Sequence, residues 1–185
     1  PLHLPPEAAE TAALAERLRA AFAVAEEAQI VVGRADVLVE RLVFTAAAQP
    51  EAVVLAAEPD FSGCRRAAER LGLRYIGVPL KADFTPDVPA MLDTLEKHKP
   101  ALVYLAAPHN PTGVLPARED VETVVRAAKG IVAIDEGFAE YGGGSFAAQA
   151  GQPENLVVLQ SLGSVGLAGL DLSLIHISEP TRQAE

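Results

Sequence analysis

The chain has 185 residues, of which 50% are hydrophobic and 22% are charged, a composition that is typical of a globular domain and excludes a disordered polypeptide. The net charge of -10, with no basic run longer than Arg65-Arg66, argues against a nucleic-acid partner. No apolar run reaches the ~20 residues that a membrane span requires, so no membrane partner is predicted either.

Helix-like and strand-like segments alternate along the chain. Composition and periodicity predict helices over residues 7–27, 36–48, 62–71, 88–98 and 116–129. Short apolar runs predict strands over residues 29–32, 52–57, 74–79, 101–107, 130–134 and 156–159. Strands that alternate with helices connect through right-handed crossovers. The predicted fold class is therefore α/β, a three-layer α/β/α arrangement with a mostly parallel sheet as the middle layer.

The residues at the two ends of the chain lead to predictions about which part of it belongs to a natural domain. The chain starts at Pro1 rather than at an initiator methionine, so we expect residues to precede it. Residues 172–182 read as the translation of a transposase sequencing adaptor, and a segment of that origin takes no part in a natural fold. We therefore expect residues 1–170 to form the domain and residues 171–185 to be a non-native tail, in which His176 has no function. A natural disordered tail is the alternative.

Polar residues follow two of the predicted strands. The segment 108–113, Pro-His-Asn-Pro-Thr-Gly, follows the strand over 101–107, and the segment 135–138, Asp-Glu-Gly-Phe, follows the strand over 130–134. Ligands of open α/β sheets bind outside the carboxyl ends of the strands. An amide and a carboxylate at two such ends suit a flat heteroaromatic ligand with a ring oxygen and a basic ring nitrogen.

These two segments resemble those of the pyridoxal-phosphate-dependent aminotransferases of fold type I, and of the histidinol-phosphate aminotransferase group in particular. The resemblance extends over residues 7–170, and it implies a partial large domain that binds pyridoxal 5'-phosphate and lacks the small domain. It also implies a parent enzyme that is a homodimer and transfers an amino group from a small-molecule amino donor to a keto or aldehyde acceptor. The single cysteine, Cys64, cannot form an internal disulfide, which favours a reducing, cytoplasmic location.

The resemblance assigns the cofactor contacts residue by residue. Asp135 would keep the ring nitrogen protonated, Asn110 would donate to the ring hydroxyl oxygen, and Phe61 would stack on the ring. Ala35 and Asp36 would bind the phosphate, because backbone amides at a helix N-terminus bind anions. The alternatives are that the two aspartates cap the segments that follow them and that the phenylalanine is a core residue.

Two departures from the family concern catalysis. Phe138 stands where the family carries a tyrosine, and the segment that ends in Gly-Leu-Ala-Gly-Leu at 166–170 lacks the Schiff-base lysine, whose position falls at Gly163 or Ser164. That lysine forms the internal aldimine and moves the α-proton, so no catalytic residue is assigned and this chain is expected not to transaminate. The arginine that follows this segment in the family is Asp171 here.

Other functions remain as alternatives. The absent lysine favours a degenerate, aminotransferase-like protein that binds a cofactor, ligand or partner without transaminating; a related decarboxylase or lyase would itself need the lysine. The run Ile131–Glu136 fits a Walker B strand, but the chain has no Gly-x-x-x-x-Gly-Lys-Ser/Thr loop. The histidines lack metal-ligand spacing, so no metal is predicted, and His109 is expected to be a turn residue beside the pocket.

Overall fold

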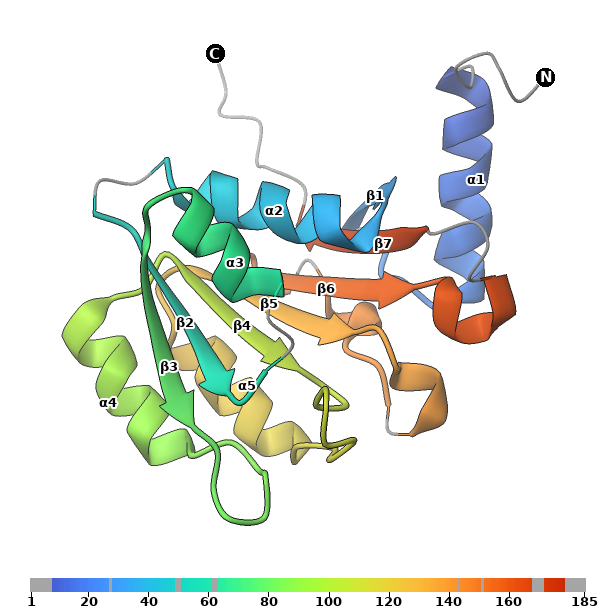
Figure 1. The fold of residues 1–185 in the computed structure, drawn as a ribbon. Helices are drawn as coiled ribbons and strands as arrows, with labels where there is room; N and C mark the ends of the chain where they lie inside the picture. The colour runs from blue at the N-terminus through green and yellow to red at the C-terminus, as the bar shows by residue number, and fades with distance from the viewer. Residues whose placement is uncertain are drawn as a thin grey trace.

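A computed structural model describes residues 8–26, 28–48, 51–60, 63–142, 144–150, 152–167 and 172–178. Its centre is a seven-stranded sheet in the order β1-β7-β6-β5-β4-β2-β3, with helices on both faces (Figure 1). The strands are β1 Ala28–Gly33, β2 Val53–Glu58, β3 Arg74–Pro79, β4 Leu102–Ala106, β5 Ile131–Glu136, β6 Leu156–Ser161 and β7 Ser173–Ser178. The helices are α1 Ala8–Ala21, α2 Ala35–Ala46, α3 Gly63–Arg70, α4 Val88–His98 and α5 Arg118–Ala127, with short 3-10 or π segments at Ala139–Tyr141, Ala147–Gln149 and Gly163–Leu167.

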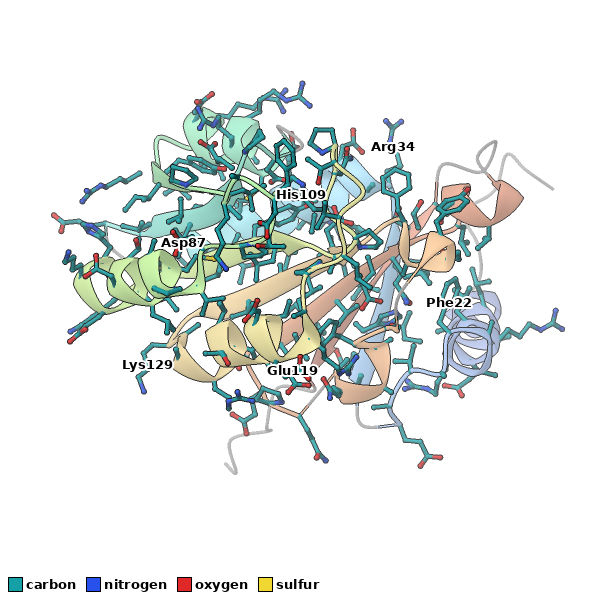
Figure 2. The ribbon with its side chains drawn as sticks, turned by 90° about the horizontal axis from the view of Figure 1, so that it is seen from below. Phe22, Arg34, Asp87, His109, Glu119 and Lys129 are labelled. Atoms are coloured by element: carbon teal, nitrogen blue, oxygen red, sulfur yellow. The ribbon has the colours of Figure 1, made fainter. Side chains whose placement is uncertain are left out.

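The central strands are buried on both faces, which explains their continuous apolar sequences. Neighbouring residues of β2 and β4 alternate between two core clusters. Leu55 and Val103 pack with Met91 of α4 and Val124 of α5, whereas Val54 packs with α2 and α3 on the other face. The helix pair α2–α3 and the pair α4–α5 therefore cover opposite faces. Figure 1 shows the resulting three layers, and Figure 2 shows the same ribbon from below with its side chains. The predicted α/β fold class is confirmed.

The strands pair in parallel except at β7, which runs antiparallel to both β1 and β6. Since the other strands point the same way, the carboxyl ends of β4 and β5 lie side by side, with Ala106 paired to Asp135. This register brings the two polar segments of the sequence to one edge of the sheet.

The sequence misplaced several boundaries. Strand β5 continues through Asp135 and Glu136, which were expected just beyond it, because these two residues pair with Leu159 and Gln160 of β6. Helix α5 begins at Arg118 rather than at Pro116. Helix α1 ends at Ala21, several residues before the predicted end.

The largest difference concerns the segment that was expected to form a tail outside the fold. Residues 173–178 instead form β7, and the side chains of Leu174 and His176 are fully buried. The physical reason is that β1 and β6 both present backbone donors and acceptors to the space between them, and the short apolar run Leu-Ile-His-Ile suits a strand that is buried between two others. The adaptor origin of these residues remains a prediction.

Within the described part of the chain, no helix has the length and apolarity needed to cross a membrane. The same residues contain no group of three or more histidine, cysteine, aspartate or glutamate side chains placed to hold a metal ion.

Candidate functional site

Asp135 is a polar side chain at the carboxyl edge of the sheet, and two hydrogen bonds orient it. Its Oδ1 accepts a hydrogen bond of 2.8 Å from the backbone N–H of Gly137, and its Oδ2 accepts one from the hydroxyl group of Tyr104. Burial raises the pKa of the Asp135 carboxyl group, and the two hydrogen bonds act in the opposite direction. The carboxylate is thus held in a fixed orientation by one side chain and one backbone amide.

A cavity of about 360 Å³ opens next to this carboxylate. Asp135 and Tyr104 come from the sheet, Ala35 and Asp36 from the first turn of α2, and Gly63 from the first residue of α3. The remaining residues that line it are Arg34, Val39, Glu40, Arg66 and Arg70. The structure therefore brings together three of the predicted cofactor contacts, namely Asp135, Ala35 and Asp36.

Asp36 does not serve as the N-cap of α2, which was the alternative to a role in binding. The N-cap residue is Arg34, and its side chain makes no capping hydrogen bond. The Asp36 carboxylate accepts from its neighbour's backbone, Val37 N–H, at 2.9 Å and from the Arg34 guanidinium at 3.2 Å. Because the Arg34 side chain donates to it, the pKa of Asp36 is lowered.

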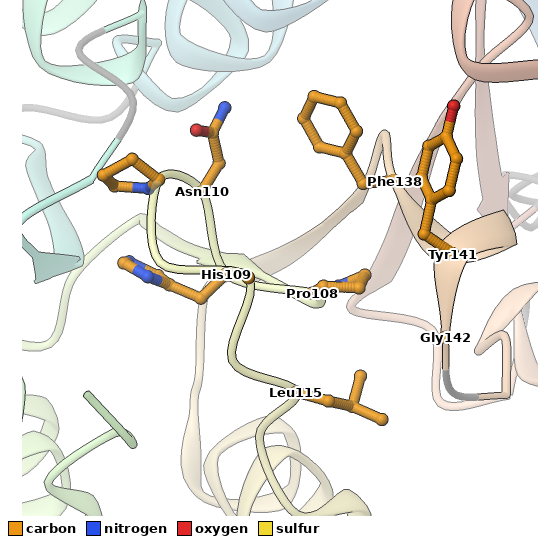
Figure 3. A pocket seen from close by; sticks show the side chains of 9 residues that line it. Pro108, His109, Asn110, Leu115, Phe138, Tyr141 and Gly142 are labelled. Atoms are coloured by element: carbon orange, nitrogen blue, oxygen red, sulfur yellow. The ribbon is translucent and has the colours of Figure 1, made fainter. Parts of the chain in front are cut away.

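Asn110 lines a second cavity, of about 320 Å³, together with His109, Phe138 and Tyr141 (Figure 3). This cavity shares no lining residue with the one that contains Asp135. Figure 3 shows the side chains of Asn110 and Phe138 projecting to the same side of their loops. The two predicted ring contacts, Asn110 and Asp135, thus lie at the same sheet edge but face separate hollows.

The turn that carries Asn110 is closed by hydrogen bonds on both sides. The backbone N–H of His109 donates to the carbonyl group of Val114 at 2.8 Å, and Gly113 N–H donates to the carbonyl group of His109 at 2.7 Å. Gly113 has a φ of +73°, a conformation that favours glycine. His109 is buried, with Nδ1 2.8 Å from Thr112 Oγ1, and burial lowers its pKa. His109 is therefore a turn residue beside the pocket, as predicted.

The two positions that could correspond to the family lysine offer no amine. Gly163 has no side chain, and Ser164 Oγ lies 2.9 Å from Glu140 Oε2 and 2.8 Å from the Ser161 carbonyl oxygen, either of which can accept its one proton. The hydroxyl group of Tyr141 donates to the Ser164 carbonyl oxygen at 2.9 Å. Because Tyr141 also lines the second cavity, it connects the segment Gly163–Leu167 to that cavity. The predicted stacking residue, Phe61, lies outside the described residues.

Sequence reasoning missed Tyr104 and Arg66. Tyr104 sits within an apolar run and gives no local sign that its hydroxyl group meets Asp135, since this contact depends on the pairing of β4 with β5. Arg66 is one of two adjacent arginines in α3, and helical periodicity alone does not tell which of them faces the sheet edge. Only the neighbours of Arg65 and Arg66 in the folded chain show which of the two lines the cavity.

The family model described as aminotransferase class I and II matches residues 3–183 of the chain. The chain belongs to this family. It is 42% identical over 170 residues to the histidinol-phosphate aminotransferase of Neisseria meningitidis serogroup B, an alignment that covers 92% of the chain and 46% of the relative. The chain therefore spans about half the length of the curated relatives that it matches.

Solved structures agree on the fold. The histidinol-phosphate aminotransferase of Clostridium acetobutylicum has a TM-score of 0.83 at 18% identity, covering 95% of this chain and 52% of the other. The enzyme of that name from Sinorhizobium meliloti, solved with pyridoxal-5'-phosphate, has a TM-score of 0.78 at 22% identity, covering 91% and 47%. The aminotransferase resemblance predicted from the sequence is confirmed at the level of the family and the fold.

Proposed function

We propose that this chain is the cofactor-binding half of a histidinol-phosphate aminotransferase-like enzyme that uses pyridoxal 5'-phosphate. The observation that carries the proposal is the Asp135 carboxylate, held by Tyr104 and the Gly137 amide at the base of a cavity that the N-terminus of α2 also lines. The relatives at 42% identity and the neighbour solved with this cofactor support it.

The residues of the cavity fit the cofactor when each is matched to a chemical group. A carboxylate at the base suits a basic ring nitrogen, and the backbone amides that begin α2 suit a phosphate. When bound, the cofactor supplies a conjugated, protonated ring that accepts electrons from the α-carbon of an amino acid.

The side chains of this protein then bind and orient. Asp135 would accept a hydrogen bond from the protonated ring nitrogen, while the Tyr104 hydroxyl group and the Gly137 amide hold the carboxylate in its orientation. The side-chain amide of Asn110 is an N–H donor of the kind that the ring oxygen requires, but it lines the other cavity, so its contact with the ring stays a prediction from the family resemblance. Phe138 brings an aromatic ring without a hydroxyl group, so it adds an apolar surface and no hydrogen bond.

Covalent attachment is not part of the proposal for this chain, because Gly163 and Ser164 cannot form an imine. We infer that the 185-residue chain binds the cofactor reversibly and has no transaminase activity. For the parent protein we propose amino transfer between a small-molecule amino donor and a keto or aldehyde acceptor, in a cytoplasmic homodimer.

The experiment that tests this proposal is to sequence the source DNA across codons 155–185 and into the flanking gene, and then to express the complete protein. We expect a lysine codon just before the Gly-Leu-Ala-Gly run and amino transfer between histidinol phosphate and a keto acid. If the complete protein retains glycine and serine there and transfers no amino group, the aminotransferase proposal is wrong.

A further inference from the structure

The cavity beside Asp135 contains one arginine that has no ion-pair partner in the part of the chain that the structure describes. Among the described residues, three arginines and three acidic residues line the cavity, and most of them are paired with each other. Arg34 pairs with Asp36 at 3.2 Å, and Arg70 donates to Glu40. Among the described residues, no ion pair or hydrogen bond involves the side chain of Arg66.

After these pairs are set aside, one cation and one carboxylate remain among the described residues of the cavity, Arg66 on α3 and Asp135 at the end of β5. Within the same residues, Asp135 receives hydrogen bonds from two uncharged donors, Tyr104 and Gly137. The first residues of α2 and α3, Ala35 and Gly63, also line the cavity, and helix N-termini carry partial positive charge. The cavity is therefore dipolar, with carboxylate at the strand end and positive potential on the helix side.

We infer that Arg66 binds the phosphate of the cofactor, a phosphate monoester on an aromatic ring whose nitrogen faces Asp135. This inference rests on the proposed function and adds to it a residue for which the sequence analysis had no role. A guanidinium group donates two hydrogen bonds to one phosphate, and such charge-assisted bonds are among the strongest in proteins. Arg66 lies on the surface of α3, so its side chain reaches a ligand without disturbing the core.

The neighbouring arginine provides a matched control. Arg65 is on the same helix and carries the same charge, but it donates to Glu58 and its guanidinium carbon lies 4.8 Å from the centre of the Tyr75 ring. It does not line the cavity. Arg65→Ala and Arg66→Ala therefore change the net charge equally, and only the second removes the unpaired cation.

The test uses the purified 185-residue chain and isothermal titration with pyridoxine 5'-phosphate and with pyridoxine. Both are alcohols, so neither forms imines with surface lysines, and they differ only in the phosphate. We expect Arg66→Ala to weaken pyridoxine 5'-phosphate binding roughly tenfold, the size of one charge-assisted hydrogen bond, and to leave pyridoxine binding unchanged. Arg65→Ala should bind both compounds as the unaltered chain does, and Arg66→Lys should recover part of the affinity.

Several outcomes would overturn the inference, and they are distinguishable. Equal binding of pyridoxine 5'-phosphate by the unaltered chain and Arg66→Ala rejects Arg66 and leaves the proposed function intact. Equal losses for pyridoxine and its phosphate indicate a general change in the cavity and also reject the role. If the unaltered chain binds neither pyridine compound, the proposed cofactor site fails together with the inference.

Discussion

Asp135 and Glu136 are adjacent carboxylates at the end of β5, and their different surroundings give them different roles. Glu136 is 1% exposed, and its oxygens accept hydrogen bonds of 2.5 Å from both Phe146 N–H and the Ser145 hydroxyl group and of 3.0 Å from Gln160 Nε2. Asp135 has fewer donors and faces a cavity. Because successive residues of a strand point to opposite faces, one position along the chain separates the two environments.

This comparison shows why the type of residue alone does not identify a binding group. Burial raises the pKa of both carboxyl groups, so an altered pKa does not distinguish them. What distinguishes them is unused hydrogen-bonding capacity next to open space. Glu136 completes a closed polar network that connects β5, β6 and the segment before Ala147, whereas Asp135 lines a cavity.

The largest effect on stability is expected when the Glu136 carboxylate, the common acceptor of this network, is removed. Glu136→Ala leaves the Phe146 amide, the Ser145 hydroxyl group and the Gln160 amide without their acceptor, which should lower the free energy of unfolding by roughly 3 kcal/mol. Urea denaturation of the 185-residue chain measures this. Asp135→Asn is the matched control, because its side-chain oxygen still accepts from Gly137, and equal losses in the two variants would contradict the comparison.

The second prediction extends the network to β7. His176 Nε2 lies 2.7 Å from Gln160 Oε1, His176 is 0% exposed, and burial lowers its pKa to about 4 from the ordinary 6.5. Between pH 4 and pH 6.5, His176 therefore binds a proton in the unfolded chain and not in the folded chain. Stability due to this residue is therefore present above pH ~6.5 and is lost as pH falls to ~4, by about 3 kcal/mol in total.

Urea denaturation between pH 4 and 7 tests this sign, comparing the unaltered chain with His176→Leu. The leucine variant should lose less stability on acidification, and subtracting its curve removes the contribution of the carboxyl groups. Parallel curves would show that His176 does not titrate differently in the folded and unfolded states.

The third prediction concerns the open carboxylate. Asp135→Asn removes the negative charge that faces the ring nitrogen, so the affinity for pyridoxine 5'-phosphate should fall roughly tenfold while the free energy of unfolding changes by less than about 1 kcal/mol. Titration calorimetry and urea denaturation give the two values. Unchanged affinity would mean that Asp135 does not contact the ligand.

The smallest effect is expected at the residue that orients Asp135. Tyr104→Phe removes one hydrogen bond to the carboxylate, which should cost about 1 kcal/mol of stability. Because that bond favours the charged form, the pKa of Asp135 should rise further when it is lost. Carbon-detected NMR titration of the aspartate carboxyl groups follows this pKa, and an unchanged or lower value would argue against the orienting role.

The sequence proposes candidate site residues, and the structure adds how they are arranged. Asn110 and Asp135 were proposed because each follows a hydrophobic run, a signal that is local in the chain. Their placement in separate cavities was not predicted, because it depends on how the turn after β4 folds against Phe138 and Tyr141. The adaptor-like residues were expected outside the fold, and a neighbouring pair of strands places them inside it.

The sequence by itself determined the alternation of strands and helices, the α/β class and the polar residues that follow strand-like runs, since these depend on hydrophobic periodicity along the chain. Only the tertiary structure decided that Tyr104 meets Asp135, that Glu136 is closed off from the cavity, and that Arg66 rather than Arg65 lines the cavity beside Asp135. These contacts depend on strand register and helix orientation. Both are determined by packing between segments that lie far apart in the chain.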